Sequence, residues 1–199
     1  MNRRLVPSPW KLAATLLGLC LWSVDLSPIA NAQTAVIPAS LQAELLAKLE
    51  NYDRAFAQRA GTSARVLIVM KPGSSKSELS ANEMKSALGR VDKIGGLAHE
   101  QSVVPYEGAA ALAQRCRSQR IAIVFVAAEL EDAAAAIGGA LFGGNVLTVG
   151  AQPSYVTKGI VLGFELESGR AKIVINLEQA RRQNVDFSSD VLRLMRVYR

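Results

Sequence analysis

The side chains suited to acid–base or metal chemistry are few and scattered in this 199-residue chain. His99 is the sole histidine, and an imidazole is the group most easily used as a general base near neutral pH. Its neighbour Glu100 falls in an expected strand, where adjacent side chains point to opposite faces, so the two cannot act on one substrate atom. No group of His, Cys and carboxylate residues has metal-ligand spacing. We therefore expect no enzyme activity, no metal site and no cofactor.

The two cysteines, Cys20 and Cys116, bear on export and redox chemistry. If a leader containing Cys20 is removed, Cys116 is alone and the mature chain cannot form an internal disulfide. Its thiol could pair between two chains or sense oxidants. The alternative, which we favour, is a small and partly buried apolar group just before an expected strand.

A loop with the sequence KPGSS at 71–75 is a candidate anion site. It follows an expected strand and leads into an expected helix, whose N-terminal N–H groups attract negative charge. It lacks the spacing of a nucleotide-binding P-loop. In the alternative interpretation the proline and glycine only make a turn, and Ser75 or Ser77 caps the helix. The candidate anion-binding residues are Gly73, Ser74 and Ser75.

A second candidate surface is the loop at 150–159, which follows an expected parallel strand at 146–149. Open α/β sheets bind ligands beyond the carboxyl ends of their strands. The loop offers polar groups around an aromatic ring, as a recognition loop does. An ordinary connection bent by Pro153 fits equally well. The candidate partner contacts here are Gln152, Tyr155 and Lys158.

The chain has a net charge of +6, and most of this excess lies near the C-terminus, where seven basic residues and three acidic ones follow position 169. Such a surface could face an acidic partner or anionic lipid. Alternatively, the arginines only complement the dipoles of helix ends. Basic and aromatic residues do not interleave, so we expect no nucleic-acid partner. The candidate contacts are Arg181, Arg182, Arg193 and Arg196.

The hydrophobic pattern behind these candidates alternates between helix and strand. Helices are expected at 41–61, 77–88, 107–115 and 129–141, and strands at 66–70, 100–104, 121–126 and 146–149. Strands separated by such helices require parallel crossovers. We therefore expect an α/β fold over 33–199, a single three-layer sandwich with a mostly parallel sheet.

The C-terminal third predicts a β-hairpin and two closing helices. Two strands with period-2 alternation meet at Ser168-Gly169, a pair that suits a tight turn. Asn176 is placed to cap a short helix that runs through Gln183. A final helix follows, with Ser188 or Ser189 as its cap and an apolar stripe at Val191, Leu194, Met195 and Tyr198.

This C-terminal run resembles the YfiR/HmsC family of small exported bacterial proteins. The residues that carry the resemblance are Leu147, Thr148, Val149, Pro153, Tyr155, Gly159, Ile160, Phe164, Leu166, Gly169, Ile175, Asn176, Ala180, Ser188, Leu192 and Leu194. The stretch GIVLGF stands where the family usually shows one like GGMINF. The resemblance implies a regulator that holds the extracytoplasmic sensor domain of an inner-membrane diguanylate cyclase inactive, and so controls cyclic-di-GMP and biofilm formation.

Two further expectations concern partners. A homodimer could form through an apolar helix face. The alternative function is a periplasmic small-ligand-binding or envelope-assembly module that works with a transporter or secretion system.

Residues 1–32 are typical of a cleaved signal peptide. Basic residues precede an apolar core at 12–22, and Ala-Asn-Ala at 30–32 supplies small residues for cleavage. The core is too short to cross a bilayer. We expect export to the periplasm and no stable membrane insertion after cleavage. A lipoprotein modified at Cys20 is less favoured, because Leu19 before it is not small.

Overall fold

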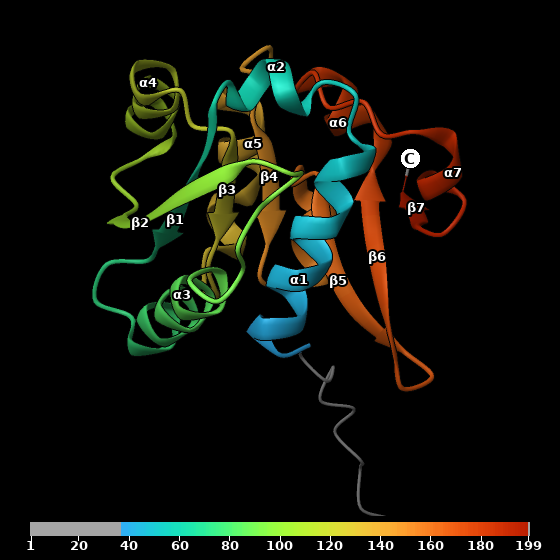
Figure 1. The fold of residues 1–199 in the computed structure, drawn as a ribbon. Coiled ribbons are helices and arrows are strands. Elements are labelled where there is room, and N and C mark those ends of the chain that lie inside the picture. The colour runs from blue at the N-terminus through green and yellow to red at the C-terminus, as the bar shows by residue number, and fades with distance from the viewer. Residues whose placement is uncertain (1–36, 199) are drawn as a thin grey trace, which may run out of the picture. The chain divides into compact units, whose positions relative to one another are not determined.

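The computed structural model describes residues 37–198, and Figure 1 shows their arrangement. The expected signal peptide and its cleavage site lie outside the described residues. Within 37–198, no helix is both long enough and apolar enough to span a bilayer.

A seven-stranded sheet with the order β2-β1-β3-β4-β5-β6-β7 forms the centre of the fold. Neighbouring strands from β2 to β5 are parallel, β5 and β6 form an antiparallel hairpin, and β7 runs parallel to β6. The prediction of a mostly parallel sheet is confirmed. The strands are β1 Ser63–Met70, β2 Ala98–Pro105, β3 Ile123–Val126, β4 Leu147–Gly150, β5 Leu162–Glu167, β6 Arg170–Asn176 and β7 Arg196–Tyr198.

Helices cover both faces of this sheet, which confirms the three layers (Figure 1). One face packs against α1 (Ala39–Leu49) and α3 (Ser75–Leu88), and the other against α4 (Ala109–Gln119) and α5 (Ala134–Ala140). Successive side chains of a strand point to opposite faces. Accordingly, Ile68 of β1 joins the cluster under α1 and α3, whereas Val69 joins the cluster under α4 and α5.

The continuous helix expected over 41–61 is wrong, because the chain breaks at Asp53. The observed elements are α1, a 3-10 turn η1 (Glu50–Tyr52) and a short α2 (Phe56–Ala60). Asp53 has an extended backbone, and its Oδ1 accepts hydrogen bonds from the N–H groups of Ala55 at 2.9 Å and Asp186 at 3.1 Å. A side chain that bonds nearby backbone in this way competes with helix formation.

The C-terminal hairpin and the helix after it are as expected. Ser168 and Gly169 have φ values of 50° and 76°, and positive φ at both central positions is what a type I′ turn requires. The Asn176 side chain accepts from the Gln179 N–H at 2.9 Å and caps α6 (Leu177–Arg182).

The expected final helix is wrong beyond its first turn. Helix α7 (Ser189–Leu192) has 4 residues, and the chain then extends as β7 alongside β6. Val191 and Met195 of the predicted apolar stripe are buried, but Leu194 is 71% exposed. Pairing with the free edge of β6 satisfies backbone groups that a longer helix would otherwise satisfy internally.

Candidate functional site

The carboxyl ends of β1, β3 and β4 bring the two candidate loops to one edge of the sheet. Strand β1 lies between β2 and β3, and the connections from β1 and β2 cross opposite faces through α3 and α4. The gap between β1 and β3 is therefore a topological switch point, where α/β folds tend to bind ligands. The loop at 71–75 follows β1, and the loop at 150–159 begins at the end of β4.

The cap of α3 is Ser74 and not Ser75 or Ser77, so that part of the prediction is wrong. Ser74 Oγ accepts from the Ser77 N–H at 3.1 Å, and Ser77 Oγ accepts from the Lys71 N–H at 2.8 Å. Gly73, with φ of +73°, makes the turn that precedes the cap. Ser75 is the first residue of α3 and is exposed.

A carboxylate of the protein itself already occupies the space beside this helix end. Ser74 donates its hydroxyl to Glu129 Oε2 at 2.5 Å, and Lys76 Nζ lies 3.6 Å from Glu129 Oε1. The hydrogen bond from Ser74, with the nearby Lys76 and Lys71, lowers the pKa of Glu129. An external anion at Gly73, Ser74 and Ser75 would have to displace this carboxylate.

A small pocket of about 170 Å³ lies beside the same edge, between α1, α3 and the ends of β3 and β4. Its wall is largely apolar, with Leu79, Met84 and Phe125, and it includes the polar side chains of Lys76 and Gln152. Cavities that hold small-molecule ligands are usually about 300 Å³ or more. Gln152 therefore lines a recess that suits a small apolar group better than a whole metabolite.

Tyr155 is buried, which contradicts its prediction as a partner contact. Its hydroxyl donates to the Ala127 carbonyl at 3.2 Å and accepts from the Leu130 N–H at 3.1 Å, and burial raises its pKa to about 12. The ring ties the 3-10 segment η3 (Pro153–Lys158) to the turn after β3. In the same loop Lys158 is exposed and pairs with Glu131 Oε1 at 3.1 Å.

The four candidate arginines are all exposed, but they belong to two separate places. Arg181 and Arg182 end α6, where Arg182 pairs with Glu178 and its carbonyl accepts from the Gly143 N–H at 2.7 Å. Arg193 follows α7, and Arg196 lies in β7, where it pairs with Glu165 at 2.8 Å.

The edge strand β7 is the feature that sequence reasoning missed. It is the outermost strand at its end of the described sheet, so one row of its backbone groups faces no neighbouring strand there. Val197 within it is exposed, and so is Leu194 two residues before it. Leu194 shares a shallow hollow with Arg170, Lys172 and the acidic Glu167. An unpaired edge of this kind is a template for an added strand. The run Val197-Tyr198, rich in strand-favouring residues, was the available sequence signal.

His99 and Cys116 belong neither to the carboxyl edge of the sheet nor to the surface around β7. His99 Nε2 lies 2.7 Å from the Val91 carbonyl. Cys116 is buried in α4, where desolvation raises the pKa of its thiol to about 12, so the thiol stays protonated. A disulfide between chains would require α4 to move. Residues 37–198 hold no group of three or more His, Cys, Asp or Glu side chains placed to bind a metal ion.

Comparison with known proteins matches residues 39–196 to a family model described as YfiR/HmsC-like. A search of curated protein sequences finds no match.

Three solved structures resemble the chain in fold. The first is an ABC domain in complex with L-Trp from Streptococcus pneumonia, with 14% identity, a TM-score of 0.57, and coverage of 81% of this chain and 60% of that one. The second is a conserved domain protein from Vibrio cholerae O1 biovar El Tor, with 13% identity, a TM-score of 0.53, and coverage of 81% of this chain and 60% of that one. The third is a ligand-free, open substrate-binding protein with adhesive properties from Clostridium difficile. It has 10% identity, a TM-score of 0.52, and coverage of 73% of this chain and 57% of that one. The chain thus spans three fifths or less of each of these proteins, and at such identities the likeness concerns the fold alone.

Proposed function

This chain belongs to the YfiR/HmsC-like family, and we propose that it is a non-enzymatic periplasmic regulator of an inner-membrane diguanylate cyclase. It binds the extracytoplasmic sensor domain of the cyclase and holds it inactive. Release of the sensor then raises cyclic-di-GMP and favours biofilm formation.

The observation that carries this proposal is the open edge of β7. An extended segment of the sensor adds to this edge as an eighth strand, using main-chain hydrogen bonds for affinity. Exposed Leu194 and Val197 supply apolar contact. The exposed Arg170, in the same hollow as Leu194, and the exposed Arg193, next to Leu194 in the chain, select an acidic segment.

Inhibition on this scheme is a population shift of the sensor. The regulator must bind the inactive conformation better than the active one, because equal affinity for both shifts nothing. Moving a sensor from 1% to 99% inactive requires about a 10⁴-fold difference in affinity between its two conformations. An interface that forms only when the sensor presents an extended segment provides such a difference.

The test is an affinity pull-down of the tagged, exported protein from solubilised membranes. The wild type should recover a membrane cyclase, and Leu194→Asp should recover at least about tenfold less, since a charge would be buried at the apolar centre of the contact. Arg181→Glu, which adds negative charge at the end of α6, is the matched control and should recover the cyclase as the wild type does. Recovery of transporter or envelope proteins alone would contradict the proposal.

The second candidate is a small-ligand-binding module, favoured by the pocket beside the carboxyl edge of the sheet. The structures of similar fold include one bound to L-Trp and one substrate-binding protein. The pocket here has only about 170 Å³, and the chain spans about 60% of the L-Trp-bound protein. A thermal-shift screen of free amino acids would favour this candidate if one of them raised the melting temperature and Phe125→Trp, which fills the pocket, abolished the effect.

A further inference from the structure

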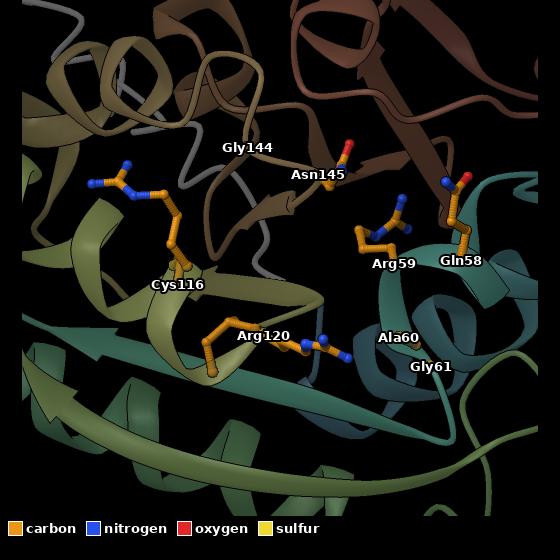
Figure 2. Close-up of a pocket in the computed structure, with 10 residues that line it drawn as sticks. Gln58, Arg59, Ala60, Gly61, Cys116, Arg120, Gly144 and Asn145 are labelled. Carbon is orange, nitrogen blue, oxygen red and sulfur yellow. The ribbon is translucent and has the colours of Figure 1, made fainter.

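A larger cavity of about 350 Å³ lies at the opposite, amino-terminal edge of the sheet. It is formed by α2, by the end of α4 and by the turn before β4, and Figure 2 shows side chains of all three around it. Its lining, all within the described residues, contains three arginines and no carboxylate. The charged and amide side chains of this lining belong to Gln58, Arg59, Arg117, Arg120 and Asn145.

Arg59 is the unusual member of this lining, because its side chain is only 2% exposed and two of its three side-chain nitrogens have no acceptor. Nη2 donates to Glu50 Oε2 at 2.9 Å and to Asp53 Oδ2 at 2.5 Å. Nε and Nη1 are buried and have no hydrogen-bond partner among residues 37–198. Buried guanidinium N–H groups are normally satisfied, so these two nitrogens leave part of the positive charge of Arg59 without a partner beneath the cavity.

The charge balance around Arg59 also favours an added anion. Burial raises the pKa of Glu50 to about 8, against the opposing effect of Arg59, so Glu50 is mostly protonated at neutral pH. Asp53 is then the single buried carboxylate that compensates Arg59. Arg117 and Arg120 add two positive charges to the lining, and the cavity is net positive.

The carbonyl groups at the end of α4 do not cancel this positive charge. The Cys116 carbonyl accepts from the Ile121 N–H at 3.0 Å, and the Gln119 carbonyl accepts from Arg65 Nη1 at 2.7 Å. Arg120 ends the helix in the left-handed conformation, with φ of 49°. Asn145 accepts from Asn184 through its Oδ1 at 2.6 Å, so its Nδ2 donors are left for the cavity.

We propose that this cavity binds the phosphate or carboxylate group of a small molecule, with Arg120 as its principal donor and the buried charge of Arg59 beneath it. The exposed guanidinium of Arg120 is a fork that matches two oxygens of such a group. Arg120 extends from the end of α4, and Asn145 lies in the turn before β4 (Figure 2). Both side chains donate to the anion. The volume is at the lower end of small-molecule sites. This site does not depend on the proposed cyclase partner.

The test is titration calorimetry of the purified, exported protein at pH 6.5 with inorganic phosphate and, separately, with succinate. Sodium chloride at matched ionic strength serves as the blank. We expect saturable binding of one anion per chain. Stronger binding of phosphate would assign the ligand to phosphate compounds, and stronger binding of succinate would assign it to carboxylates.

Arg120→Gln is the decisive variant, because Arg120 is exposed and its replacement should leave the fold intact. It should weaken binding by about 10-fold to 100-fold, as expected for loss of a charged hydrogen bond. Arg170→Gln, which removes the same charge from the hairpin, should bind as the wild type does. The proposal is overturned if neither anion binds saturably, or if Arg120→Gln and the wild type bind equally well.

Discussion

Positively charged groups are paired to different extents at the two ends of the sheet. At the carboxyl edge, the N-terminus of α3 and Lys76 face Glu129, which Ser74 also holds at 2.5 Å. At the amino edge, Arg59 is buried with only one of its three side-chain nitrogens engaged. The carboxyl edge is where α/β folds usually bind ligands. In this protein the amino edge has two buried guanidinium nitrogens without a partner, whereas the pocket at the carboxyl edge has one such atom, the neutral Gln42 Oε1. The unpaired buried positive charge therefore lies away from the place that fold analogy favours.

The largest expected effect comes from breaking the amino end. Arg59→Ala should lower the free energy of unfolding by about 3–5 kcal/mol, because it leaves the buried Asp53 without its cationic partner and the buried Glu50 without a hydrogen-bond donor. Urea denaturation at pH 7 measures this change. Arg182→Ala, which breaks the exposed pair with Glu178, should cost less than about 1 kcal/mol. Equal losses in the two variants would contradict the buried cluster.

The second largest effect is the pH dependence of the stability that Glu50 causes at the amino edge. The folded protein holds the Glu50 proton up to about pH 8, whereas an unfolded chain releases it near 4.5. The folded state therefore binds more protons in this window, and Glu50 makes stability fall as pH rises from about 5 to about 8. The fall should be about 2–4 kcal/mol. In Glu50→Gln this part of the pH dependence should vanish in denaturation curves measured at pH 5, 6, 7 and 8, whereas Glu129→Gln should retain it.

A smaller effect is expected at the carboxyl end from Tyr155→Phe. The change keeps the buried ring but leaves the Ala127 carbonyl and the Leu130 N–H without their partner. It should cost about 1–3 kcal/mol by thermal or urea denaturation. Tyr198→Phe, in the edge strand, is the matched control and should be nearly neutral. If Tyr155→Phe did not change the stability, the buried hydrogen bonds of Tyr155 would be contradicted and the exposed position predicted from the sequence would be favoured.

The smallest effect concerns the helix cap that faces Glu129. Ser74→Ala removes the acceptor for the Ser77 N–H and should cost about 1 kcal/mol. Ser75→Ala, one residue later and exposed, should change the stability by no more than about 0.5 kcal/mol. If the two variants behaved in the opposite way, the cap assigned from the sequence would be right and the one in the structure wrong.

The elements that depend on local pattern were predictable. Continuous apolar runs indicated β1, β3 and β4, and period-2 alternation with a Ser-Gly turn indicated the hairpin. The Asn176 cap follows from a side chain and an N–H only three residues apart. The family resemblance, read from the last third of the chain, agrees with the family model over residues 39–196.

The elements that depend on distant contacts were not predictable. Strand β7 exists because it pairs with β6, whereas the same residues taken alone have helical spacing. Tyr155 looked accessible because its loop is polar, but its hydroxyl partners lie 25 and 28 residues earlier. The Arg59 cluster was hidden by the expected continuous helix, which the structure interrupts at Asp53.

The hydrogen bond from the Asp186 N–H to Asp53 joins positions 133 residues apart. Contacts of such long range slow folding, because a large loop must close before they form. Helix α1 and η1 can form early. The hydrogen bond that joins their end to Asp186, however, can form only after almost the whole domain has been synthesised. The amino-terminal helices therefore lock last together with the C-terminal segment, so a chain truncated before residue 186 should lack this closure and be degraded quickly by proteases.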